Sequence, residues 1–139
     1  MNMKTKLPLI VPLFFGVLLS GCAFNVSYLK QVPAQFTPGE ESSHDFVLAH
    51  DIKVSLGTGF PTCLKGGTRW HQVGVTGSGA VFITRDQVVT VEASNIYEAQ
   101  MVVSNGRLTG FYLPVEGKFA PVSQPIPIET QPTTTASQP

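Results

Sequence analysis

The sequence predicts an all-β protein whose centre is a small antiparallel barrel or sandwich, and three features of its 139 residues support this fold class. Eleven prolines and thirteen glycines interrupt the chain too often for long helices. Between residues 45 and 122, short apolar runs are separated by glycine-containing breaks, a pattern typical of strands joined by turns. The length of that region suits one small domain and not two.

The first 21 residues differ in composition from the rest of the chain. Lys4 and Lys6 precede thirteen uncharged, mostly apolar residues at 7–19. This order is that of a secretory signal peptide. A membrane-spanning helix needs about 20 apolar residues, and this run is shorter and contains prolines. We therefore expect residues 1–21 to be a signal peptide that is removed.

The segment Leu19-Ser20-Gly21-Cys22 resembles the bacterial lipobox. The resemblance implies cleavage between Gly21 and Cys22, transfer of a diacylglycerol to the Cys22 thiol, and a third acyl chain on the new amino terminus. Two or more acyl chains anchor a protein stably to a membrane. The resemblance to Gram-negative lipoproteins, with Ala23 after the cysteine, implies release to the outer membrane, because retention in the inner membrane usually requires aspartate at that position. An ordinary secretory signal with an incidental cysteine is the alternative.

The charge balance limits the classes of partner. Charged residues make up 13% of the chain, against about 25% in typical soluble domains. Loss of Lys4 and Lys6 leaves seven basic side chains against nine acidic ones. We therefore expect no nucleic-acid partner and no electrostatic adhesion to anionic lipid. The expected partners are a membrane, through the lipid anchor, and a protein of the cell envelope.

The segments on either side of the strand-rich region show no sustained hydrophobic period. Residues 22–44 mix Asn, Ser, Gln, Pro and Gly and predict a flexible lipidated tether, with a reach of at most about 70 Å. Residues 123–139 are rich in Pro and Thr and predict a disordered tail. Docking of this tail on an aromatic groove is the alternative. The small β domain is accordingly expected at residues 45–122.

Each strand of this domain is predicted from an apolar run, and each turn from polar residues or glycine. Residues 52–56 alternate between apolar and polar side chains, which predicts a strand with one buried face. Residues 95–99 are the one place where a helical turn is plausible. The remaining elements are strands at 69–75, 80–84 and 88–93, with turns at 77–79 and 85–87.

Asn105-Gly106 lies between two apolar runs and is the clearest local signal in the chain. Both residues tolerate positive φ, so we predict a β-hairpin with a type I′ turn. With a two-residue turn, the paired side chains on one face of the two strands are expected to be buried. Its expected pairs are Val103 with Leu108, Met101 with Gly110, and Ala99 with Tyr112.

The segment 66–74 contains the single tryptophan, Trp70, between two glycine steps. Together with the later Gly-x-Val-Phe at 79–82, it resembles SH3-like barrels, which implies that fold as one form of the predicted barrel. Trp70 can serve as a core plug. Alternatively, Trp70 and Phe111 both face outward and form a partner-binding patch.

Reactive side chains are few. The histidines are confined to His44-Asp45, His50-Asp51 and His71, and a metal site needs three or four convergent ligands. No phosphate-binding glycine loop and no Gly-x-Ser-x-Gly motif occurs. We expect Cys63 to be a small buried hydrophobe, with an intermolecular disulfide or a reactive thiol as alternatives. No catalytic residue, metal or cofactor is expected.

As a whole, residues 45–122 are similar to short lipoproteins of Gram-negative bacteria to which no activity is attached. The recurring segments are 67–70, 91–93 and 110–114. We expect a non-enzymatic lipoprotein on the periplasmic face of the outer membrane, whose β domain binds or scaffolds an envelope partner. The alternatives are an accessory or pilot lipoprotein of a secretion, conjugation or pilus apparatus, and an envelope hydrolase or metal-dependent enzyme.

Overall fold

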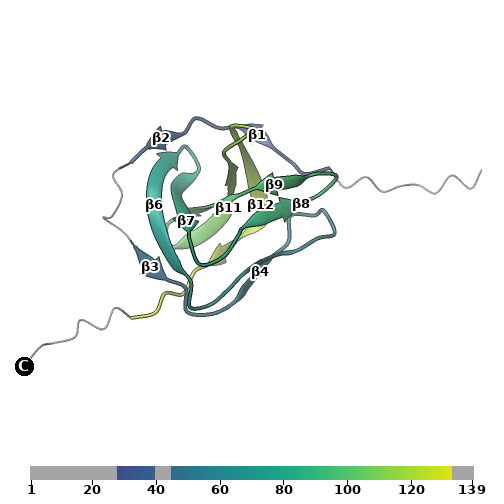
Figure 1. The fold of residues 1–139 in the computed structure, drawn as a ribbon. Coiled ribbons are helices and arrows are strands. Elements are labelled where there is room, and N and C mark those ends of the chain that lie inside the picture. The colour runs from purple at the N-terminus through teal and green to yellow at the C-terminus, as the bar shows by residue number, and fades with distance from the viewer. Residues whose placement is uncertain (1–27, 40–44, 133–139) are drawn as a thin grey trace, which may run out of the picture.

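The computed structural model describes residues 28–39 and 45–132, in which every regular element is a β-strand (Figure 1). All strand pairs are antiparallel, so the predicted all-β antiparallel fold is confirmed. In these ranges no helix has the length and hydropathy needed to cross a membrane. The predicted signal peptide with Gly21, the lipidation site Cys22, and His44 lie outside the described residues.

One large sheet and two separate hairpins make up the described fold. The large sheet has the order β1-β12-β11-β10-β7-β6-β2, and β3 also pairs with β6. Its strands are β1 (Val32–Pro33), β2 (Thr37–Pro38), β3 (Phe46–Val47), β6 (Arg69–Thr76), β7 (Gly79–Thr84), β10 (Gln100–Ser104), β11 (Arg107–Leu113) and β12 (Lys118–Pro127). The hairpins are β4 (Ile52–Val54) with β5 (Thr62–Leu64), and β8 (Thr90–Glu92) with β9 (Ile96–Glu98).

Residues 32–38, the crossing segment, connect the two edges of the large sheet. β1 pairs with β12 at one edge, and β2 pairs with β6 at the other. In a flat sheet these two strands would lie six strand spacings apart, about 29 Å. The chain from Pro33 to Thr37 spans at most about 14 Å. The sheet must therefore curl, and Figure 1 shows it as a half-barrel with β1 and β2 at its rim.

The β domain is larger than the predicted range 45–122. Residues 28–39, assigned by the sequence to the tether, provide β1, β2 and the buried Leu29. β12 continues to Pro127, and Leu48 forms an isolated bridge with Thr130. The boundaries were wrong because these segments pair with distant strands and carry no periodic pattern of their own. Pro33 in β1 and Pro38 in β2 are compatible with strand pairing, because edge strands tolerate a missing N–H donor.

Both faces of the large sheet are covered. One face packs against the two hairpins around Trp70, Met101 and Phe111, all fully buried. The other face carries a smaller cluster of Val81, Val102, Tyr112 and Phe119, onto which the crossing segment packs Ala34 and Phe36. Packing of Ala34 and Phe36 on the smaller cluster holds the crossing segment against the sheet.

The structure confirms the hairpin at Asn105-Gly106 and corrects its register. Asn105 has a φ of 52° and Gly106 a φ of 72°, as a type I′ turn requires. Thr109 is an extra residue in β11, so the pairing shifts after the first two pairs. Such a bulge cannot be seen in an alternating pattern. The observed pairs are Val103 with Leu108, Val102 with Gly110, Met101 with Phe111, and Gln100 with Tyr112.

The other local predictions hold in part. The strands expected at 69–75 and 80–84, and the turns between and after them, occur close to the predicted positions. The strand expected at 52–56 ends at Val54. The strand expected at 88–93 is shorter, covering Thr90–Glu92. The helical turn proposed for 95–99 is wrong, because Ile96–Glu98 forms β9. Pairing of Tyr97 with Val91 against the core favours the strand over a local helical turn.

Replacing Gly106 with valine tests the turn. We expect the free energy of unfolding to fall by about 1 kcal/mol or more, because a β-branched side chain disfavours positive φ. Gly77→Val is the matched control, since Gly77 has no positive φ and open space where its Cβ would lie. Urea denaturation of both variants makes the comparison. Equal losses at the two positions would contradict the assigned turn geometry.

Candidate functional site

Neither of the two aromatic residues predicted for a partner-binding patch is at the surface. Trp70 and Phe111 are both 0% exposed. The indole N–H of Trp70 donates to Thr68 Oγ1 at 2.9 Å, which satisfies its polar atom inside the core. The bulge at Thr109 places Phe111 on the same buried face as Met101. The prediction that Trp70 and Phe111 form an exposed patch is therefore wrong, and the alternative prediction that Trp70 fills the core is confirmed.

The histidine and acidic side chains form separate pairs. His71 Nδ1 lies 2.8 Å from Asp45 Oδ2, beside a cavity of about 320 Å³ between β3, β6 and residues 130–132. His50 Nε2 lies 3.2 Å from Glu129 Oε2, and both side chains are largely exposed. Asp51 is not part of either pair and accepts a hydrogen bond from the Gly66 N–H at 2.7 Å.

These pairs do not converge on a metal site. Within residues 28–39 and 45–132, no three His, Cys, Asp or Glu side chains lie close enough together to hold an ion. Cys63 is exposed, which contradicts the expectation of a buried hydrophobe. It stands between the buried Thr62 and Leu64 in β5, so strand alternation turns its side chain outward.

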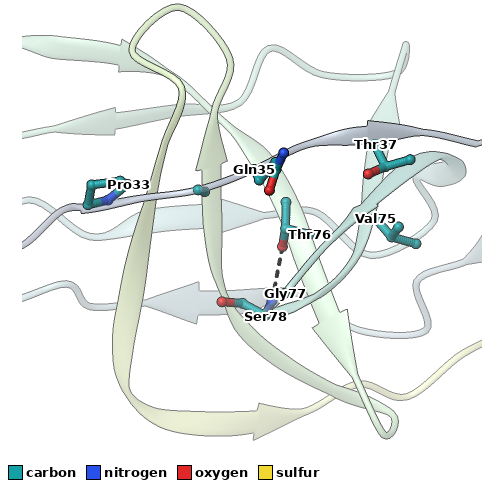
Figure 2. A pocket seen from close by; sticks show the side chains of 8 residues that line it. Pro33, Gln35, Thr37, Val75, Thr76, Gly77 and Ser78 are labelled. Carbon is teal, nitrogen blue, oxygen red and sulfur yellow. Dashed lines mark hydrogen bonds between the residues drawn. The ribbon is translucent and has the colours of Figure 1, made fainter.

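One hollow in the described surface is a groove between the crossing segment and the β6–β7 turn. It has a volume of about 470 Å³, within the usual range for ligand pockets of about 300–1,000 Å³. Figure 2 shows Gln35 and Thr76 in its middle, Pro33 at one end, and Thr37 with Val75 at the other. The lining residues are Pro33, Ala34, Gln35, Thr37, Val75, Thr76, Gly77 and Ser78.

One wall of the groove is fixed from below by aromatic packing. The Phe36 ring stacks on the Tyr112 ring, with 5.1 Å between centroids and 12° between planes. Gly74 lets the Phe36 ring lie close to β6, because a Cβ at position 74 would lie 2.5 Å from that ring. Phe36 points into the core, so its neighbours Gln35 and Thr37 point outward, as strand alternation requires.

The other wall is the two-residue turn Gly77-Ser78, held by side-chain hydrogen bonds. The Ser78 N–H donates to Thr76 Oγ1 at 3.2 Å, as the dashed line in Figure 2 marks. The Ser78 carbonyl accepts a hydrogen bond from Thr109 Oγ1 at 3.1 Å. Thr109 is the bulged residue of β11, so the bulge supports the groove as well as shifting the register.

No lining residue of the groove has a charged side chain. Hydroxyl, amide and backbone groups can form hydrogen bonds there, and Val75, 43% exposed, offers an apolar contact. A lining of this kind can bind an uncharged ligand through hydrogen bonds and one apolar contact. It supplies neither a general base nor a nucleophile paired with one.

The groove could not be predicted from the sequence, because one wall is formed by residues 33–37 and the other by residues 75–78. The signal that was available is Pro33-Ala34-Gln35-Phe36-Thr37-Pro38, in which one aromatic residue lies between two prolines. That pattern fits an extended segment pinned by one buried ring. It does not reveal which strand the segment lies beside.

Comparisons with known proteins do not indicate a family for this chain. No family model matches the chain, and no curated protein or solved structure is significantly similar to it. The expected likeness to SH3-like barrels and to Gram-negative lipoproteins therefore stays a prediction.

Proposed function

We propose that this protein is a non-enzymatic lipoprotein, anchored through Cys22 to the periplasmic face of the outer membrane, that binds an envelope protein in the groove. The observation that carries the proposal is the groove itself, a preformed, uncharged hollow of about 470 Å³ between the crossing segment and the β6–β7 turn. The likeness of residues 19–22 to a lipobox supports the anchor.

The structure of the groove supports a role in binding rather than in catalysis. Both walls of the groove are tied to the core, one by the Phe36–Tyr112 stack and one by Thr109. A rigid site loses little conformational entropy on binding, which favours affinity. The groove offers exposed hydrogen-bonding groups around Val75, and a protein segment entering it would match them.

The anchor makes weak binding sufficient. Confinement to a membrane surface raises the effective concentration of the domain near any other envelope protein. A small, weak contact of the low-area class is then sufficient. An accessory role in a secretion, conjugation or pilus apparatus would use the same groove and differs only in the identity of the partner.

Photo-crosslinking tests the groove as a binding site. A photoreactive residue in place of Gln35, in the lipidated full chain in cells, should give a crosslinked product of one defined mass. Adding Val75→Glu should reduce that product about tenfold or more, since an unpaired carboxylate in the contact costs at least about 1.4 kcal/mol. Val88→Glu is the control, because Val88 is 88% exposed and lies outside the groove.

Two outcomes would overturn the proposed function. The first is crosslinking that Val75→Glu leaves unchanged. The second is loss of a cellular phenotype in a folded His71→Ala variant whose crosslink persists. That result would favour the envelope-enzyme alternative, because His71 and Asp45 form the pair beside the second cavity.

A further inference from the structure

We propose that one end of the β domain lies directly against the lipid bilayer. This end, the membrane-facing end, consists of residues 28–31, the β4–β5 connection at 55–61 and the β8–β9 turn at 93–95 with the adjoining start of β9. The inference rests on the proposed function, since it requires acylation at Cys22.

The length of chain between the anchor and the domain sets the first constraint. Leu29 is buried in the larger core cluster, so the domain is already fixed to the chain at that residue. Six residue steps separate Cys22 from Tyr28. Whatever their conformation, they span at most about 21 Å. The tether of about 70 Å expected from residues 22–44 is therefore too long, and the point of entry must stay near the membrane.

The arrangement of the fold sets the second constraint. In Figure 1 the chain enters the domain at the end that also holds the β4–β5 connection and the β8–β9 turn, on the right of the view. The last described residues leave at the opposite end, beside β3. There the Gln131 N–H donates to the Val47 carbonyl. The entry end is therefore the part of the domain held nearest to the bilayer when Cys22 is anchored in it.

The exposed apolar side chains support the same orientation. Each of the three segments presents one: Tyr28 is 81% exposed, Phe60 54% and Ile96 71%. Tyr28 and Phe60 are the two aromatic residues among the seven exposed large apolar side chains of the described chain. Tyrosine is enriched at the level of lipid headgroups, where its ring meets an apolar layer and its hydroxyl meets water. Phenylalanine and other large apolar side chains suit shallow insertion at the same boundary.

Charge does not drive this contact. Lys30 is exposed two residues after Tyr28, and its positive charge suits anionic headgroups. Glu92 is also exposed and lies opposite Ile96 in the β8–β9 hairpin, so its negative charge offsets that of Lys30. The contact consists of shallow insertion of apolar side chains at headgroup depth. The groove is formed elsewhere, by the crossing segment and the β6–β7 turn, so the bilayer and a protein partner would occupy different parts of the domain.

Fluorescence quenching in vesicles tests this orientation. The lipidated full chain with Cys63→Ser and Phe60→Cys carries an environment-sensitive dye at position 60, because the Cys22 thiol is already consumed by lipid. The vesicles contain phosphatidylethanolamine, phosphatidylglycerol and a lipid with a quencher at headgroup depth. We expect a blue shift of the dye emission and loss of most of its intensity. Ile96→Cys in the same background should give the same result.

Gln131→Cys is the matched control, since Gln131 is exposed at the opposite end. Its dye should show neither blue shift nor strong quenching. Equal quenching at positions 60, 96 and 131 in acylated, vesicle-bound protein would overturn the orientation and leave the anchor intact. Protein without acyl mass at Cys22 would overturn both the anchor and this inference. Melting curves of the labelled variants show whether they keep the fold.

Discussion

Replacing Trp70 with alanine should lower the free energy of unfolding by about 3–5 kcal/mol, the usual cost of removing a large aromatic side chain from a core. Trp70 is fully buried, lies in the larger cluster and donates its indole N–H to Thr68 Oγ1. The alanine variant loses the packing and leaves a cavity. Because small domains are stable by only about 5–15 kcal/mol, much of the native population would be lost at elevated temperature.

Thermal and urea unfolding measure this effect. Val88→Ala is the control, because Val88 is exposed and its loss should change stability by less than about 0.5 kcal/mol. A Trp70→Ala variant that melts at the temperature of the parent would contradict the assignment of Trp70 to the core. It would also restore the tryptophan as a candidate for surface recognition.

Replacing Cys22 with serine should abolish both acylation and processing. Serine has no thiol to accept the diacylglycerol, so the chain should accumulate as the full-length precursor. Metabolic labelling with a radioactive fatty acid, followed by electrophoresis, measures both properties. The expected result is an unlabelled band of precursor size.

Cys63→Ser is the matched control for this experiment. Cys63 is exposed in β5 and plays no part in the proposed anchor, so its replacement should leave labelling and processing at the level of the parent. Undiminished labelling of Cys22→Ser would show that the acyl chains are attached elsewhere.

Local features of this fold were predictable from the sequence, and long-range ones were not. The Asn105-Gly106 turn follows from the φ values that its two residues tolerate. The strand at Ile52–Val54 follows from alternation. The exposure of Cys63 could also have been predicted, since it alternates with two buried neighbours in β5.

The crossing segment shows why the rest could not be predicted. Its two strands have only two residues each, and their partners, β12 and β6, lie far away in the sequence. No hydrophobic period develops over so short a length. The groove depends on this crossing, on the extra residue Thr109 and on the close approach at Gly74. Each of these is a property of two segments together, which a single strand pattern does not encode.

The mass of the intact mature protein, extracted from cell membranes, measures cleavage and acylation at Cys22 together. We expect a chain that begins at Cys22 and carries the added mass of a diacylglycerol and one further acyl chain. A chain that keeps residues 1–21, or one cleaved elsewhere with a free thiol at Cys22, would contradict it.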